Sequence, residues 1–243
     1  MLDRPTAPAV TADDCAEALT RFRERRPHVH CITNAVAQNV TANVLLAAGA
    51  TPSMTVAPAE IGGFITFADA LLVNLGTMDA ERREAARIAV GEVGSKPWAL
   101  DPVFVQASPP RLELAHEMLA AGPTLVRANA AERAVLPPLD GLVAITGERD
   151  EIRDGRRTAH VLNGVPVMIR VTAMGCALTA LAAGFLAAND DPFTATVAAH
   201  AFFGLAGERA AERSEGPGTF QPALLDALAN IAPDELAHGA RLA

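Results

Sequence analysis

Aromatic residues and cysteines are scarce in this chain of 243 residues. Aromatic side chains make up 4% of it, with one Trp and no Tyr, whereas 50% of the residues are hydrophobic. The core must therefore be aliphatic, and the apolar content excludes wholesale disorder. Cys15, Cys31 and Cys176 have no CxxC spacing and leave one thiol unpaired, which excludes a disulfide framework. Free thiols favour a reducing compartment, so we expect the cytoplasm.

Positive charge and long hydrophobic runs are lacking as well. Lys and Arg number 20 against 28 Asp and Glu, which gives a formal net charge of −8 at pH 7. This acidic balance disfavours a nucleic-acid-binding surface. The most apolar stretch, from Cys176 to Ala188, is too short to cross a bilayer and is interpreted as a buried helix. We expect neither nucleic acid nor a membrane as a partner.

Strand-like apolar runs alternate with helical patterns along the whole chain. No repeat or long linker interrupts them, so we predict a single domain over residues 1–243, with residues 1–10 as a flexible tail. Aliphatic strands that alternate with helices are typical of a mostly parallel α/β sheet covered on both faces. Asn163-Gly164, between Arg157–Leu162 and Val165–Ile169, indicates a β-hairpin. We therefore predict an antiparallel hairpin at one edge of the sheet.

Apolar runs and capping residues set the predicted bounds of the elements. Strands are predicted at His28–Thr33, Ser53–Val56, Leu71–Leu75, Trp98–Leu100, Thr124–Val126 and Leu142–Ile145. Helices are predicted at Thr11–Arg25, Ala35–Ala48, Asp79–Val93, Arg111–Ala121, Ala130–Leu136, Gly175–Ala188, Pro192–Arg213 and Phe220–Ala229. Thr11 with Asp14 forms a capping-box pattern, and Asp79 is an expected N-cap.

Residues that follow the predicted strands are the candidates for chemistry, because ligands of open α/β sheets bind beyond the carboxyl ends of the strands. Thr172–Cys176 is the most informative segment, since a short loop that opens a buried helix presents free N–H groups to an anion. Cys176 lies in the first helical turn, where a thiolate is favoured. The alternative interpretation is a plain turn at Gly175 and a packed Cys176.

Carboxylates and an arginine follow other predicted strands. Asp101 and Glu132 are candidate Mg²⁺ ligands, because this ion takes one or two carboxylates with waters and phosphates. The alternatives are a strand-end Asp and a solvated helix Glu. Arg127 can clamp a phosphate with its planar fork, or form a surface salt bridge. Thr146-Gly147 can hydrogen-bond a nucleotide, or form an ordinary turn.

Seven segments carry a more specific signal through their order and spacing. They are ITNAVAQNVTANVLLAAGATPSM (32–54), ALLVNLGTMD (70–79), WALDPV (98–103), LVRANAAE (125–132), VAITGERD (143–150), VTAMGCALTA (171–180) and GPGTFQPALLDAL (216–228). Together they resemble the hydroxyethylthiazole kinase family of the ribokinase-like superfamily. The resemblance implies a three-layer α/β/α sandwich and a homotrimer with active sites at subunit contacts. It also implies ATP- and Mg²⁺-dependent phosphorylation of the hydroxyl of 4-methyl-5-(2-hydroxyethyl)thiazole in thiamine salvage.

The resemblance also implies a role for each candidate residue. Cys176 takes the catalytic position, where it either accepts the proton of the alcohol or only positions the alcohol. The loop from Ala173 to Cys176 takes the place of the anion hole. By the same resemblance, Asn34, Met54, Ala173 and Gly175 bind the substrate, Arg127, Asn129, Thr146 and Gly147 bind ATP, and Asp101 and Glu132 bind the metal.

Some positions depart from the family's pattern. Ala173 replaces a glycine of the anion-hole loop, where a Cβ restricts both φ and the approach of a phosphate. Phe104 and Gln106 replace two glycines after Asp101, and Ala128 replaces another. These changes leave two alternatives open. One is a kinase of the same fold for another small heteroaromatic alcohol or a sugar, and the other is a thiazole- or nucleotide-binding protein with weakened catalysis.

Overall fold

One eight-stranded sheet organises the computed structural model, which describes residues 10–243. The strands are β1 (His28–Ile32), β2 (Thr51–Ser53), β3 (Ala70–Asn74), β4 (Trp98–Asp101), β5 (Leu125–Asn129), β6 (Leu142–Thr146), β7 (Asp150–Arg153) and β8 (Thr158–Val161). Their order is β2-β1-β3-β4-β5-β6-β7-β8. All neighbours up to β6 pair in parallel, and β7 and β8 are antiparallel. This confirms a mostly parallel sheet with an antiparallel edge.

Helices fill the connections between these strands. The α-helices in residues 10–243 are α1 (Ala12–Arg25), α2 (Gln38–Ala48), α3 (Pro58–Phe67), α4 (Ala80–Glu92), α5 (Pro109–Ala120), α6 (Ala130–Val135), α7 (Met174–Ala188), α8 (Pro192–Glu212), α9 (Pro217–Asn230) and α10 (Pro233–Gly239). Short 3-10 helices span Val105–Ala107 and Pro166–Arg170. None of these helices has the length and apolar character needed to cross a membrane. The predicted tail lies outside the described residues except for Val10, which is buried.

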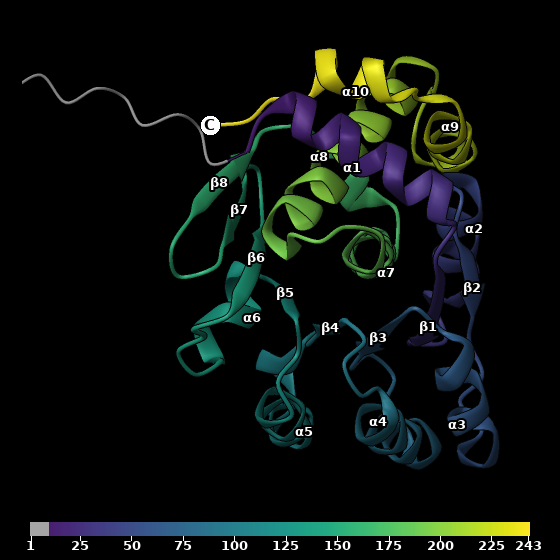
Figure 1. The fold of residues 1–243 in the computed structure, drawn as a ribbon, viewed down its shortest axis with the longest axis vertical. Coiled ribbons are helices and arrows are strands. Elements are labelled where there is room, and N and C mark those ends of the chain that lie inside the picture. Colours follow the sequence, from purple (N-terminus) through teal and green to yellow (C-terminus); the bar gives the residue numbers. More distant parts are fainter. Residues whose placement is uncertain (1–9) are drawn as a thin grey trace, which may run out of the picture.

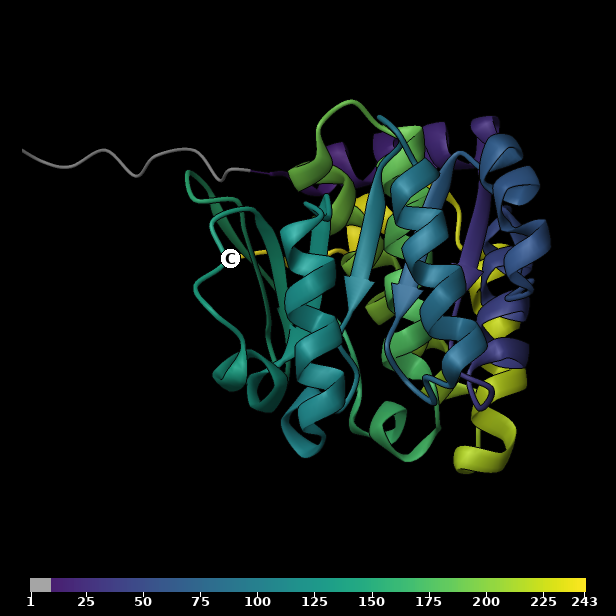
Figure 2. The ribbon, with the colours of Figure 1, turned by 90° about the horizontal axis from the view of Figure 1, so that it is seen from below.

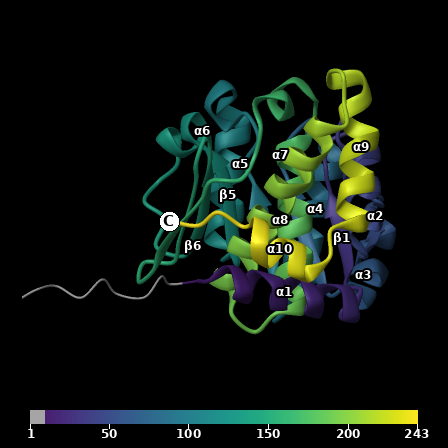
Figure 3. The same cartoon turned by 90° about the horizontal axis from the view of Figure 1, so that it is seen from above.

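Helices cover both faces of the sheet, as a three-layer sandwich requires (Figure 1). One face packs against α3, α4, α5 and α6, which Figure 2 shows in front, and the other against α1, α2, α7, α8, α9 and α10, several of which face the viewer in Figure 3. Alternate strand residues supply the two cores. Leu72 of β3 belongs to the α7 side, whereas its neighbours Leu71 and Val73 belong to the α4 side. The predicted alternation of buried strands and helices is confirmed.

Local capping signals account for the start of several helices. Thr11 and Asp14 form the predicted capping box of α1, and Asp79 accepts the N–H of Arg82 at the start of α4. The apolar stretch Cys176–Ala188 is the buried helix α7, as predicted. α2 begins at Gln38, three residues after the predicted start, and α3 and α10 are helices that the sequence pattern does not predict.

The antiparallel hairpin is not where Asn163-Gly164 predicts it. It joins β7 to β8, and its turn is built on Asp154, whose Oδ1 accepts the N–H groups of Arg156 and Arg157. The predicted second strand, Val165–Ile169, is largely the 3-10 helix Pro166–Arg170. Proline has no N–H for a strand ladder. The Asn163 side chain instead donates to the Gly239 carbonyl at 2.9 Å, so a long-range contact replaces the expected pairing.

Parallel pairing brings the carboxyl ends of β1, β3, β4, β5 and β6 to one edge of the sheet. Asn74 pairs with Asp101, and Asn129 pairs with Thr146, in the strand register. In Figure 2 the arrowheads of the central strands point toward the green loop that leads into α7. The predicted site residues therefore meet the N-terminus of α7 at this edge.

Candidate active site

Polar side chains at the ends of three neighbouring strands form a buried network. Nδ2 of Asn34, which follows β1, donates to Oδ1 of Asn74 at 3.0 Å. Nδ2 of Asn74, the last residue of β3, donates to Oδ2 of Asp101, the last residue of β4, at 2.8 Å. Asn34 is 6% exposed, and the other two residues are completely buried. These buried hydrogen bonds hold the three side chains in one arrangement.

Cys176 joins this network from the first turn of α7. Its Sγ accepts a hydrogen bond from Nδ2 of Asn34 at 3.4 Å. Burial, followed by the negative charge of Asp101, raises the pKa of the Cys176 thiol to about 11, although nearby Asn74, Asn34 and Arg127 oppose the rise. The sequence predicts a favoured thiolate at this position, but burial outweighs the helix terminus. The thiol is therefore neutral near pH 7.

The start of α7 presents free backbone donors. Ala173, its N-cap, is in the left-handed conformation with φ 67° and makes no side-chain cap. The N–H groups of the first helical turn have no partner inside a helix, so those of Met174, Gly175 and Cys176 face the edge of the sheet. Such a terminus attracts an anion through both its donors and its dipole.

Arg127 bridges the ends of three strands. From β5, its Nη2 donates to Oγ1 of Thr146 on β6 at 2.6 Å, and its Nη1 lies 3.8 Å from Oδ1 of Asp101 on β4. A Cβ on Gly175 would lie 2.6 Å from that Nη1, so the guanidinium packs directly on the helix terminus. The structure thus excludes an exposed surface salt bridge for Arg127, whose side chain is 12% exposed.

The two oxygens of the Asp101 carboxylate have different surroundings. Oδ2 accepts hydrogen bonds from Asn74 and from Oγ1 of Thr179, the latter at 3.1 Å. Within residues 10–243, Oδ1 has no hydrogen-bond partner, although it is buried. Burial raises the pKa of Asp101 to about 6, against the opposing charge of Arg127, and Glu132 adds to the rise. An unpaired oxygen on a buried carboxylate is a position for a cation.

Asn129 and Glu132 form a capping box at the start of α6. Oδ1 of Asn129 accepts the N–H of Glu132 at 2.9 Å, and Oε2 of Glu132 accepts the N–H of Asn129 at 2.8 Å. Oε1 of Glu132 also accepts the N–H of Phe104 at 3.0 Å. Each carboxylate oxygen thus holds one backbone donor and retains one further acceptor site. Glu132 is 3% exposed, which excludes a solvated helix position.

Comparisons with known proteins decide which family this site belongs to. The model of the hydroxyethylthiazole kinase family matches residues 19–142 and 133–234. A probable hydroxyethylthiazole kinase from Agrobacterium fabrum is 45% identical over 235 residues, 96% of each chain. The chain belongs to the hydroxyethylthiazole kinase family. The solved structure of the hydroxyethylthiazole kinase protein from Pyrococcus horikoshii matches with a TM-score of 0.91 at 37% identity, and the match covers 94% of this chain and 98% of that chain.

The fold of this hydroxyethylthiazole kinase family member extends to more distant relatives. A ribokinase-like superfamily protein from Enterococcus faecalis matches with a TM-score of 0.67 at 13% identity, covering 96% of this chain and all of its own. This likeness shows the fold alone, and it confirms the predicted ribokinase-like architecture. As a family member the protein is a kinase, a transferase of phosphoryl groups, and kinases work on ATP with a divalent metal.

The residues of this family member fit a hard cation that keeps most of its water. No group of three or more His, Cys, Asp or Glu side chains in the described part of the chain makes a metal cage. Mg²⁺ does not need one, because it binds through one or two carboxylates, waters and substrate phosphates. The unpaired Oδ1 of Asp101 would be available as a direct ligand of such an ion, and Glu132 has acceptor sites left for waters that the ion would carry.

Met54 and Gly147 lie outside the network. Met54 is partly buried against the apolar cluster on the α7 side of the sheet. The N–H of Gly147 donates to Oδ1 of Asp150 at 3.0 Å, and Oδ2 of Asp150 is 2.7 Å from Nδ1 of the buried His200. His200 of α8 therefore holds the turn after β6 in place through Asp150.

Two members of the network were not predicted from sequence. Asn74 ends an apolar strand just before Leu75-Gly76, where an asparagine is typical of an ordinary turn. Thr179 lies one helical turn after Gly175, whose carbonyl also accepts its hydroxyl at 3.0 Å. The available signal was positional, since Asn74 directly follows the same kind of buried run as Asp101.

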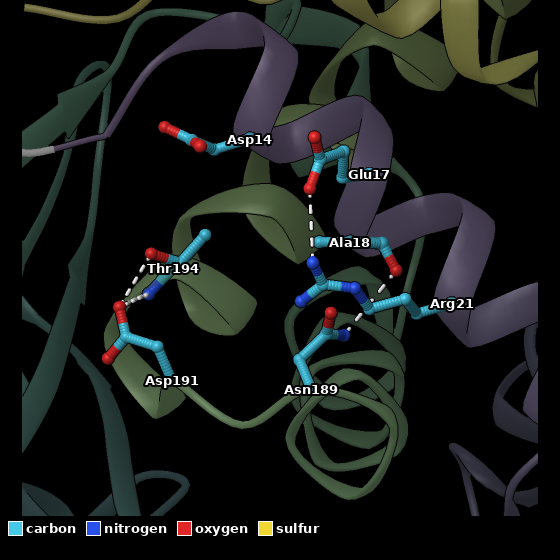
Figure 4. A pocket seen from close by; sticks show the side chains of 7 residues that line it. All are labelled: Asp14, Glu17, Ala18, Arg21, Asn189, Asp191 and Thr194. Carbon is cyan, nitrogen blue, oxygen red and sulfur yellow. Dashed lines mark hydrogen bonds and ion pairs between the residues drawn. The ribbon is translucent and has the colours of Figure 1, made fainter.

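A separate hollow lies at the opposite edge of the sheet (Figure 4). It has a volume of about 160 Å³ and lies between α1 and the loop from α7 to α8, where Asn189 lies beside Arg21 and Asp191 faces Thr194. This volume is below the roughly 300–1,000 Å³ of small-molecule sites. Cys176 lies near the start of α7 and the hollow lies beyond its end at Ala188, which separates them by about 18 Å at 1.5 Å per residue. It has no part in the candidate active site.

Proposed function

We propose that this protein transfers the γ-phosphoryl group of ATP to the hydroxyl of 4-methyl-5-(2-hydroxyethyl)thiazole, a step of thiamine salvage. One observation carries the proposal beyond family membership. The free N–H groups at the start of α7, the thiol of Cys176 and the carboxylate of Asp101 converge at one edge of the sheet, joined by Asn34 and Asn74. Phosphoryl transfer needs this combination of positioning and charge stabilisation.

The acceptor end of the proposed site is centred on Cys176. Asn34, Met54, Ala173 and Gly175 are proposed to bind the thiazole alcohol beside it. Because the thiol is neutral near pH 7, we propose that Cys176 positions the hydroxyl and does not accept its proton as a thiolate would. The N–H groups of the loop Ala173–Cys176 would hold the transferred phosphoryl group as charge spreads over its oxygens.

The donor end is built from β4, β5 and β6. Arg127, Asn129, Thr146 and Gly147 are proposed to bind ATP, with the guanidinium of Arg127 balancing phosphate charge. Asp101 would hold Mg²⁺ through Oδ1, and Glu132 through water. When bound, the ion neutralises the charge of the ATP phosphates and so favours transfer. Asp101 and Arg127 keep their relative placement without it, since Thr146, Asn74 and Thr179 fix them from the protein side.

We also propose that the chain acts as a single domain in a cytoplasmic homotrimer. The three cysteines are free and buried, which supports a reducing compartment. Support for the assembly comes from apolar side chains near the edge strand β2: Val36 is 61% exposed, Leu46 of α2 is 58% exposed and Phe67 of α3 is 78% exposed. Val36 lies two residues after Asn34, so an interface here would border the acceptor end.

ADP release from Mg·ATP in the presence of the thiazole alcohol tests the proposed function. We expect thiazole-dependent turnover that falls by about 10-fold or more in Cys176→Ala, because a misplaced acceptor loses the near-attack geometry. Hydroxymethylpyrimidine and ribose, assayed in parallel, separate the proposed acceptor from another alcohol. Turnover of either in place of the thiazole would overturn the substrate assignment. Ligand binding without ADP release would identify a non-catalytic binding protein.

A further inference from the structure

The side chain of Asn74 forms hydrogen bonds with Asn34, Gly76 and Asp101 at the candidate active site. Its Oδ1 accepts from Nδ2 of Asn34 and from the N–H of Gly76, both at 3.0 Å. Its Nδ2 donates to Oδ2 of Asp101 at 2.8 Å. The side chain is completely buried at the end of β3, so water does not compete for these bonds. Asn74 is the direct link between the residue that contacts Cys176 and the carboxylate of Asp101.

The direction of this chain of hydrogen bonds is fixed at both amides. The N–H of Gly76 can only donate, so the oxygen of Asn74 must face it and the nitrogen must face Asp101. The N–H of Ala37 donates to Oδ1 of Asn34 at 2.9 Å, which turns the nitrogen of Asn34 toward Asn74 and Cys176. Backbone groups thus exclude the flipped form of each amide, and the carboxylate is the final acceptor.

The packing around the hydrogen bonds from Asn34 to Asn74 leaves no room for another arrangement of these side chains. A Cβ on Gly76 would lie 2.7 Å from Cβ of Asn34 and 2.9 Å from its Nδ2. Gly76 therefore allows the close approach that Asn34 needs to reach both Asn74 and Cys176. On the other side, Asn74 and Thr179 together occupy Oδ2 of Asp101, which leaves Oδ1 as the oxygen that faces Arg127.

We propose that Asn74 is a positioning residue that fixes the acceptor end of the site, through Asn34, relative to the phosphate end, through Asp101. This inference rests on the proposed kinase function of the same site. The amide keeps Oδ2 of Asp101 engaged, so that Oδ1 is directed toward the phosphates and their cation. It also keeps Asn34 beside the thiol that contacts the alcohol. Loss of the amide frees the two ends from each other, so that Asn34 and Asp101 no longer keep one relative arrangement.

Two substitutions test this role. Asn74→Ala removes all three side-chain hydrogen bonds, whereas Asn74→Asp keeps the acceptor for Gly76 and Asn34 but places a second buried carboxyl group against Asp101, so that the two would share one proton and the charge of Asp101 would be weakened. We expect both to lower kcat at least about 10-fold with KM for the thiazole alcohol changed less than about 3-fold, since misplacement by a fraction of an ångström slows transfer more than it weakens binding. Steady-state kinetics on both substrates give this comparison.

A binding measurement tests the phosphate end without turnover. Calorimetry of ADP with Mg²⁺ and with EDTA gives the factor by which the metal strengthens binding. We expect that factor to fall at least about 3-fold in Asn74→Ala, because Asp101 no longer holds Oδ1 in place, and to fall further in Asp101→Asn, which removes a ligand. Asn189→Ala is the matched control, since its amide lies at the far end of α7 and donates to the Phe185 carbonyl.

The outcomes separate the inference from the proposed function. An unchanged kcat in Asn74→Ala, or an equal loss in Asn189→Ala, would show a purely structural amide and overturn the inference. If Asn74→Ala does not fold, the same criteria apply to Asn74→Asp. A wild-type protein without thiazole-dependent turnover would refute the proposed function, while the metal-dependent binding of ADP would still decide the role of Asn74.

Discussion

Arg127 lies against Gly175 so closely that any side chain at position 175 would displace its guanidinium. The ideal Cβ would be 2.6 Å from Nη1 and 2.7 Å from Nη2. The same guanidinium donates to Thr146 and faces Asp101. The proposed ATP site therefore requires a glycine at position 175 as much as the start of α7 does.

Gly175→Ala should weaken nucleotide binding more than it destabilises the fold. The long Arg127 side chain can move away from the new methyl group, but it then leaves Thr146 and the phosphate position. We expect KM for ATP to rise about 10-fold, the loss of one charge-assisted phosphate contact. Steady-state kinetics with ATP as the varied substrate measure the effect.

Gly91→Ala is the control for this prediction. A Cβ at Gly91 on α4 meets nothing within 4 Å, so the substitution tests only helix propensity. We expect KM for ATP to stay unchanged and stability to rise by up to about 1 kcal/mol. An equal rise of KM in both variants would show that Arg127 does not depend on Gly175.

Cys176→Ser should keep most of the activity. The serine hydroxyl is neutral like the thiol of Cys176, whose pKa is raised to about 11, and it can accept the same bond from Asn34. We expect kcat within about 10-fold of wild type, because a neutral thiol that only positions the alcohol can be replaced by a hydroxyl. If a thiolate acted as general base, its loss would lower kcat by about 10²–10⁴-fold. A fall in kcat of more than 100-fold would show that Cys176 acts as the base in its thiolate form.

Ala173→Gly should favour the approach of the phosphate. Ala173 holds φ at 67°, which costs an L-residue roughly 1–2 kcal/mol and which glycine adopts freely. Glycine also adds freedom to the unfolded chain, about 0.4–1 kcal/mol, so net stability should change little. We expect kcat/KM for ATP to rise a few-fold, because no Cβ borders the free N–H groups. A fall in kcat/KM would show that the methyl group is part of the acceptor pocket.

Much of this site was predictable because the carboxyl ends of parallel strands lie at the same edge of a sheet. Asn34, Asp101, Arg127 and Thr146 each lie at or near the carboxyl end of a recognisable apolar run, and the sheet brings all four to one edge. The capping box of Asn129 and Glu132 shows how one motif serves two purposes. The same N-x-x-E spacing starts α6 and holds a carboxylate beside Asp101.

Other features depend on contacts that no local pattern contains. Asn74 becomes the centre of the network only through the register that pairs it with Asp101. The neutral thiol of Cys176 follows from burial between α7 and the sheet, which outweighs the helix terminus. The antiparallel hairpin at the edge is confirmed, but its predicted position in the sequence was wrong for a similar reason. Asn163-Gly164 is a favourable turn, but Pro166 and the contact of Asn163 with Gly239 exclude the second strand.

Leu46→Glu should break the proposed trimer. Leu46 is 58% exposed on α2, and an apolar side chain there is explained by a partner subunit. Light scattering should give the wild type three times the 25.3 kDa of the chain, and the variant the mass of one chain. A wild-type mass of 25.3 kDa would refute the trimer outright.

Asp101→Asn should stabilise the protein while it abolishes turnover, and the gain should depend on pH. The pKa of Asp101 is about 6 in the fold, above the ordinary value of 3.8, because burial disfavours the carboxylate. The unfolded chain therefore loses this proton at lower pH than the folded chain does. It follows that the free energy of unfolding decreases as pH rises from about 4 to 6, by at most about 3 kcal/mol, and is constant above that range.

The asparagine variant lacks this titration. The difference in Tm between variant and wild type therefore reports the titration of Asp101 separately from that of all other groups. We expect the variant to be more stable at pH 7.5, by a smaller margin at pH 5, and by the smallest margin at pH 4. Thermal unfolding at these three pH values measures the trend. A margin that is constant with pH would mean that Asp101 has the same pKa in the folded and the unfolded chain, with the charge of Arg127 offsetting burial. That result would contradict the pH dependence expected from the burial of this carboxyl group.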